Sequence, residues 1–141
     1  MPRAFPIQMS KRLPLAALAL AISTLGACVA IPDAPIVEGT PVAEGTAVAI
    51  GQPVRVGDIV ATPMKVVEDS RCPMNARCVW AGRLIVQTRI DGAGWRDTAN
   101  ITLGETYGTH DRVIALVSGL PEKTADRETQ PAEYRFVYER R

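Results

Sequence analysis

The chain has 141 residues, 47% of them hydrophobic, and its 16 basic and 15 acidic residues give a formal net charge of +1. Lysine and arginine are dispersed rather than clustered, which excludes the electrostatic footprint of a protein that binds nucleic acid or acidic polymers. The length suits one domain with one hydrophobic core, and not two.

Residues 1–27 have the pattern of an export signal. Arg3, Lys11 and Arg12 supply positive charge without an acid, and an apolar segment rich in Leu and Ala follows over residues 13–25. A transmembrane helix needs roughly 20 apolar residues, whereas this segment has only about 13. Cleavage of the segment is therefore favoured over the alternative, a retained helical anchor.

The end of this segment, Leu25-Gly26-Ala27-Cys28, resembles the lipobox of bacterial lipoprotein precursors. The resemblance implies cleavage before Cys28 and acylation of its thiol and new amino group with fatty acids of the palmitate type. One acyl chain binds a membrane reversibly, whereas several chains on one residue hold the protein there. Val29, in place of an Asp, points to the outer membrane of the bacterial envelope. Loss of three basic residues and no acidic one leaves 13 against 15, a net charge of −2.

Residues 28–47 are predicted to be the lipidated cysteine and a flexible tether, ahead of a β domain over residues 48–141. The tether is rich in Pro, Gly, Thr and Ala and contains an imperfect doublet, 36–41 and 42–47. About 20 such residues reach on the order of 25 Å as a coil. The alternative is that the two halves of the doublet are paired edge strands.

Beyond the tether, hydrophobic residues recur with a period of two, as in half-buried antiparallel strands. The alternation covers residues 62–67, 84–90 and 95–103. Asp91-Gly92-Ala93-Gly94 separates the last two runs, and Asp-Gly supplies the positive φ angles of a tight hairpin. We therefore expect a β-hairpin centred on residues 91–94.

The C-terminal third continues this pattern. Val113 to Val117 is an apolar run of strand length, and Tyr134, Phe136 and Tyr138 fall on one face of a strand. A helix is expected only as a turn within residues 104–111 or 121–132. Short strands joined by Gly and Pro turns predict an all-β fold, a small antiparallel sandwich or barrel.

Cys72 and Cys78 are the thiols that remain when Cys28 carries lipid. In an exported domain they should form a disulfide. The chain-entropy model gives roughly 2–2.5 kcal/mol of stabilisation for so short a loop. The alternative is a metal site formed by both cysteines with His110, which requires reduced thiols and a fourth ligand.

Two stretches around these cysteines, Asp69-Ser70-Arg71-Cys72-Pro73 and Cys78-Val79-Trp80-Ala81-Gly82, resemble the DSRCP…CxWAG signature of a family of small bacterial lipoproteins and exported proteins. The order of strands from residue 47 to residue 139 fits the same family. The resemblance implies a compact β domain with a Cys72–Cys78 bond. The family has no settled activity, substrate or cofactor, so the resemblance implies none here.

The motif also has a structural interpretation from its residue types alone. Asp69 and Ser70 can accept hydrogen bonds from nearby backbone amides and close a turn where a strand ends. Arg71 can pair in bidentate fashion with Glu68 or Asp69. Trp80 offers a large apolar plate to cover the disulfide, and a glycine two residues later permits a positive φ.

A functional interpretation of the same loop is that it forms a rigid binding surface. The candidate binding residues are Arg71, Met74, Asn75, Arg77 and Trp80. A pre-organised loop loses less entropy on binding than a flexible one.

Candidate catalytic groups are sparse. His110 adjoins Asp111 and would need Ser70 or Ser118 beside it to form a nucleophile triad. Glu68 and Asp69 are neighbours in a strand and point to opposite faces, which argues against a shared acid pair or calcium site. We therefore expect no catalytic site, no metal and no cofactor.

These observations together predict a non-enzymatic, lipid-anchored envelope domain that acts as a binding or structural module, with an envelope protein as a possible partner. One alternative is a protease inhibitor that presents the Cys72–Cys78 loop as a pre-formed strand, with Arg77 or Met74 offered to the protease. Another alternative is a hydrolase centred on His110.

Overall fold

The computed structural model describes residues 39–141 of the chain. The predicted signal over residues 1–27, the lipidated Cys28 and the first part of the predicted tether lie outside the described residues. The statements about structure that follow concern residues 39–141.

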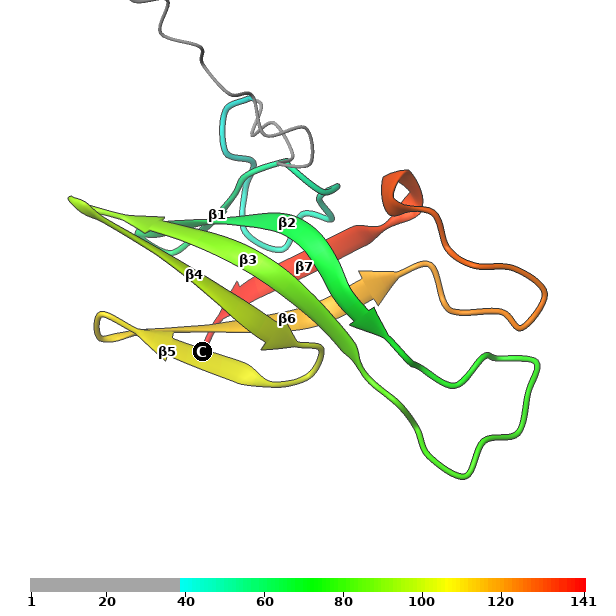
Figure 1. Cartoon of the computed structure of the whole chain (residues 1–141). Coiled ribbons are helices and arrows are strands. Elements are labelled where there is room, and N and C mark those ends of the chain that lie inside the picture. The colour runs from blue at the N-terminus through cyan, green and yellow to red at the C-terminus, as the bar shows by residue number, and fades with distance from the viewer. Residues whose placement is uncertain (1–38) are drawn as a thin grey trace, which may run out of the picture. The chain divides into compact units, whose positions relative to one another are not determined.

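Two antiparallel sheets make up the domain, as Figure 1 shows. The first sheet has the order β1-β2-β3-β4 and the second has the order β5-β6-β7. Each strand pairs with its neighbour in sequence within its sheet, so both sheets are meanders. The first sheet comprises β1 (Val54–Val56), β2 (Ile59–Asp69), β3 (Leu84–Gly92) and β4 (Trp95–Thr102). The second comprises β5 (Thr106–Thr109), β6 (Arg112–Leu120) and β7 (Arg135–Arg140).

The hydrophobic core lies between the two sheets, and the predicted all-β sandwich is confirmed. In β3 and β7 alternate residues are buried, as the period of two requires. The one polar pair within this core is Thr88 and Tyr138, whose hydroxyl oxygens lie 2.8 Å apart and satisfy each other. The largest fully buried apolar side chains are those of Tyr138, Phe136, Leu84, Ile90, Ile101, Ile114 and Leu116.

The segment 42–48 bridges the two sheets, so the second half of the predicted tether belongs to the folded domain. Val42 forms a parallel bridge with Val54 at the edge of the first sheet, and Val48 forms an antiparallel bridge with Phe136 in the second. Val48 is fully buried. The prediction of a tether up to residue 47 was therefore wrong for residues 42–47, because two apolar side chains six residues apart anchor this segment at both ends.

The predicted hairpin between β3 and β4 is confirmed, but its turn lies at residues 93–94. Gly92 pairs with Trp95, and the positive φ belongs to Gly94, at 77°, rather than to the Asp-Gly pair. Gly92 has a different role, since a Cβ there would lie 2.1 Å from Cε2 of the Trp95 indole. The glycine therefore makes room for the indole ring.

Of the two places where a turn of helix was expected, one has it. Pro131–Glu133 forms a short 3-10 turn, η1, before β7. Residues 104–111 instead contain β5 and a two-residue turn, in which His110 and Asp111 have φ angles of 46° and 59°. Two successive positive φ angles are typical of a type I′ hairpin turn, whose twist matches that of the flanking strands.

Candidate contact loop and adjoining groove

The loop between β2 and β3 extends the antiparallel pairing of these strands beyond the sheet and ends in the disulfide. The amide of Ser70 donates to the carbonyl of Arg83 at 2.9 Å, and the amide of Cys72 donates to the carbonyl of Ala81 at 2.9 Å. Cys72 and Cys78 are bonded, with Cα atoms 5.8 Å apart, which confirms the predicted disulfide and removes the alternative of a metal bound by two thiolates. We call residues 70–83 the contact loop.

Gly82 is required where the contact loop returns to β3. Its φ is +67°, and a Cβ at this position would lie 1.7 Å from the backbone oxygen of Ser70. No other residue fits there without separation of the two arms of the loop, so the predicted positive φ is confirmed.

Arg71 fastens the base of the loop to the second sheet. Its Nε and Nη2 atoms each donate to the carboxylate of Asp69 at 2.8 Å, and its Nη1 donates to the carbonyl of Gly119 at 2.7 Å. Nη2 also donates to the carbonyl of Pro121 at 3.1 Å. The side chains of Arg71 and Asp69 are only 11% and 9% exposed, respectively. The predicted bidentate pair is thus formed with Asp69, and it joins β2 to the end of β6.

Asp69 also receives the Tyr134 hydroxyl, 2.8 Å from Oδ2. Burial raises the pKa of Asp69, but the hydrogen bonds from Arg71 and Tyr134 outweigh burial and hold the pKa below its usual value. Burial and the bond to Asp69 raise the pKa of Tyr134 to about 12. Both groups therefore keep their ordinary charge states at neutral pH, and neither is poised as a general acid or base.

Glu68 lies on the other face of β2, as predicted. Its carboxylate accepts from the Ser70 hydroxyl at 2.7 Å and from Nε of Arg83 at 3.0 Å. The amide of Arg83 in turn donates to the Ser70 oxygen at 3.1 Å. This exposed network ties the two arms of the contact loop together. Ser70 is therefore engaged far from any histidine.

The tip of the contact loop packs on the long loop between β6 and β7. The amide of Met74 donates to the carbonyl of Lys123 at 2.9 Å. The Asn75 side chain accepts from the amide of Ala125 at 2.8 Å and donates to the carboxylate of Asp126 at 3.1 Å. Asn75, predicted as a binding residue, has its amide group occupied by these internal bonds.

The apolar side chains of the contact loop are exposed. Val79 is 91% exposed, Trp80 82% and Met74 71%. Arg77 is exposed as well. The prediction that Trp80 covers the disulfide was wrong, because its side chain faces solvent. The backbone of the contact loop is thus held by internal contacts, while the side chains of Trp80, Val79 and Met74 face solvent.

The backbone at the tip also bears on the inhibitor hypothesis. The amide of Ala76 donates to the carbonyl of Pro73 at 3.1 Å, so residues 73–76 form a tight turn. Met74 lies inside this turn and is therefore not part of an extended strand, whereas Arg77, the other residue of the hypothesis, lies beyond the turn.

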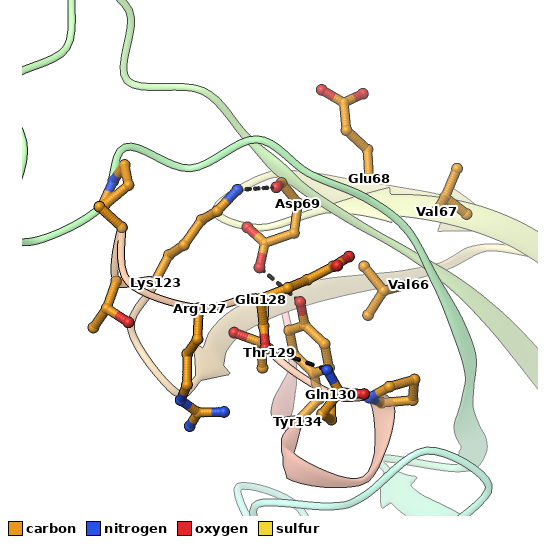
Figure 2. A pocket seen from close by; sticks show the side chains of 14 residues that line it. Val66, Val67, Glu68, Asp69, Lys123, Arg127, Glu128, Thr129, Gln130 and Tyr134 are labelled. Carbon is orange, nitrogen blue, oxygen red and sulfur yellow. Dashed lines mark hydrogen bonds between the residues drawn. The ribbon is translucent and has the colours of Figure 1, made fainter.

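A groove of about 740 Å³ adjoins the contact loop (Figure 2). One wall is the C-terminal half of β2, with Val66 and Asp69, and the other is the loop that precedes β7. Figure 2 shows Tyr134 and Lys123 both directed at Asp69, the first at its carboxylate and the second at its carbonyl oxygen, 2.6 Å away.

Most charged side chains that line the groove are engaged by partners elsewhere in the fold. Arg127 makes a two-point contact with Glu133 at 2.7 and 2.8 Å. These bonds, with that from the amide of Gln130, lower the pKa of Glu133 to about 2. Lys123 and Asp69 are engaged as described above. The groove is therefore lined by structural pairs rather than by groups converging on an empty centre.

His110 lies in the turn between β5 and β6, where its ring stacks on Trp95 with centroids 3.9 Å apart. The Nδ1 atom of His110 is 2.9 Å from the hydroxyl oxygen of Thr109, and this hydroxyl donates to the carboxylate of Asp97 at 2.8 Å. Ser118 lies six residues beyond Arg112 on β6, so these two residues are roughly 20 Å apart at the usual rise of a strand. Within residues 39–141 no serine is brought to His110.

Residues 39–141 contain no group of three or more side chains placed to ligate a metal. Nor does that part of the chain contain a helix with the length and hydrophobicity that a membrane crossing requires. Comparison with models of protein families, with curated proteins and with solved structures gave no match.

Proposed function

We propose that this protein is a lipid-anchored, non-enzymatic module of the bacterial envelope, and that it works through contacts made by residues 74–80 of the contact loop. One observation carries the proposal. Val79 and Trp80 are 91% and 82% exposed, although they lie on a loop closed by a disulfide and fastened to both sheets. Large apolar side chains exposed on an ordered loop mark interaction sites more often than folding requirements.

The energetics of the loop support a role in binding. A flexible loop loses conformational entropy when it binds, at roughly 0.5–1.5 kcal/mol for each side chain that is immobilised, together with the ordering of its backbone. Here the backbone is already ordered by the pairing of Ser70 with Arg83 and of Cys72 with Ala81. Tryptophan is among the residues that contribute most to binding energy at interfaces. Burial of the Trp80 side chain by a partner would therefore contribute binding energy without the cost of ordering the loop backbone.

The choice against catalysis rests on the state of the candidate groups. Asp69, Tyr134 and Arg127 each have a structural partner, and His110 is stacked on an indole, with the neighbouring Thr109 hydroxyl bonded to Asp97 and no serine beside it within residues 39–141. The envelope location rests on the lipobox resemblance of residues 25–28. Mass spectrometry of the protein from a bacterial membrane fraction should find an acylated Cys28 as its first residue. An unmodified Cys28, or an intact residue 1, would contradict the anchor.

The contact itself can be tested by site-specific photocrosslinking in cells. The aromatic crosslinker p-benzoylphenylalanine is placed at position 80 or, as a matched control, at position 100, an exposed site on β4. We expect adducts from position 80 and few from position 100. Equal labelling from both positions, or no adduct with either protein or lipid from position 80, would contradict contact through this loop.

A further inference from the structure

The exposed part of the contact loop combines apolar side chains with positive charge. No acidic residue occurs from Ser70 to Arg83. Arg71 and Arg83 are neutralised by Asp69 and Glu68, respectively. Arg77 takes part in none of the ion pairs found within residues 39–141. The loop therefore displays Met74, Val79 and Trp80 together with Arg77, a cation in none of these ion pairs, while the carboxylate of Asp126 from the neighbouring loop lies at Asn75.

We infer that the partner of this loop is the surface of a phospholipid bilayer, an inference that rests on the proposed function. Tryptophan prefers the membrane interface, where its ring is buried and its N–H is hydrated. Val79 and Met74 enter the same layer as aliphatic groups. Arg77 meets the phosphates, whose negative charge attracts basic residues near the surface.

The backbone of the loop suits this environment. Polar main-chain groups that enter an apolar layer must be hydrogen-bonded within the protein. The amides of Cys72 and Ala76 donate to the carbonyls of Ala81 and Pro73, so the arms and the turn satisfy part of this demand internally. A protein partner could supply hydrogen bonds to main-chain groups that the loop leaves unpaired, whereas the hydrocarbon of a bilayer cannot.

The length of chain between anchor and domain permits the contact. The 14 residues from Val29 to Val42 span at most about 46–50 Å. From Ala61, near the segment that holds Val42, β2 rises about 26 Å to Asp69, and the contact loop adds roughly 10–15 Å. Lipid at Cys28 and the contact loop can therefore reach the same membrane even if the long axis of β2 stands upright.

The test uses fluorescence of the acylated chain in vesicles of phosphatidylethanolamine and phosphatidylglycerol. The protein has two tryptophans, Trp80 and Trp95. The variant Trp95→Phe leaves Trp80 as the reporter, and Trp80→Phe leaves Trp95 as a matched control at the same protein density. We expect bromine on the acyl chains to quench Trp80 and its emission to shift to shorter wavelength, with Trp95 unchanged. In the Trp95→Phe background, Arg77→Glu should weaken the quenching.

The outcomes separate this inference from the proposed function. If Trp80 stays accessible to aqueous acrylamide and is unaffected by brominated lipid, the bilayer is not the partner. Protein adducts from the crosslinker at position 80 would then leave the contact module intact and replace its partner class. Absence of both quenching and adducts would overturn the inference and the proposed function together. Equal quenching of both tryptophans would indicate general adsorption of the domain and contradict insertion of the loop.

Discussion

Replacement of Arg71 by alanine should strongly lower the free energy of unfolding of the domain, although this arginine lies in a surface loop. The variant removes both hydrogen bonds to Asp69 and those to the carbonyls of Gly119 and Pro121. It also leaves a carboxylate that is only 9% exposed with the Tyr134 hydroxyl as its main remaining partner. Arg71→Ala is therefore the sharpest test of how the contact loop is fastened.

The expected loss follows from the burial of the pair. Removal of one partner from a fully buried ion pair costs about 3–5 kcal/mol. Water can reach Asp69 through the vacated space at the domain surface, so we expect the lower end, about 3 kcal/mol. At roughly 4–8 °C for each kcal/mol in a domain of this size, the melting temperature should fall by about 12–24 °C.

Arg83→Ala is the matched control, because Arg83 also comes from the contact loop and also pairs with an acid of β2. That pair is 61% and 35% exposed, and exposed pairs are worth about 0–1 kcal/mol. Thermal and urea unfolding of both variants, under non-reducing conditions that keep the disulfide, give the comparison. Similar losses for the two variants would refute the argument that burial and the link to Gly119 set the value of Arg71.

Four further outcomes are expected. Cys72→Ser should destabilise the domain by about 2–2.5 kcal/mol in urea unfolding, and an unchanged midpoint on reduction of the parent would contradict this. Gly82→Ala should cost at least about 1–2 kcal/mol from its positive φ alone, with a further loss because the new Cβ meets a backbone oxygen at 1.7 Å. Trp80→Ser should change stability by less than about 0.5 kcal/mol, since nothing covers this side chain, and a larger loss in thermal unfolding would show that it packs. The pKa of Asp69 is lowered on folding, so its contribution to stability is complete above its unfolded pKa and is lost as the pH falls through the folded value. The raised pKa of Tyr134 gives the opposite limb, with stability lost between pH 10 and about 12. In unfolding midpoints measured across pH, Tyr134→Phe should show a smaller alkaline loss than the parent, with part of the loss remaining because burial also raises the pKa of Tyr138. An alkaline loss equal to that of the parent would contradict this.

The strands and the core could be predicted from the sequence because their signal is local. Alternation along β3 and along Tyr134, Phe136 and Tyr138 assigns the buried face of each strand without reference to the rest of the fold. The position of the hairpin turn could not be predicted in this way. The Asp-Gly pair is a good turn former, but Gly92 pairs with Trp95 and lies beneath its ring, and the turn lies at residues 93–94.

The exposure of Trp80 depends on contacts that are distant in sequence, and local reasoning therefore failed there. A tryptophan two residues after a disulfide cysteine has the size to cover the bond. The loop that carries it is held by bonds from Asn75 to Ala125 and from Arg71 to Gly119, across about 50 residues. These partners cannot be recognised from the periodicity or the spacing of residues in the contact loop. The same holds for the bond between Tyr134 and Asp69, 65 residues apart.

Contacts within the fold account for all three residues of the Asp-Ser-Arg part of the motif. A binding role is therefore sought in other residues. Asp69 reaches Tyr134, just before β7, and Arg71 reaches Gly119 on β6, while Ser70 joins the two arms of the contact loop. Each of the three side chains is thus occupied within the fold, and none is free to contact a partner. Trp80 belongs to the same motif but is 82% exposed, so contacts within the fold explain the Asp-Ser-Arg residues and do not explain the tryptophan, which the proposed contact role would account for.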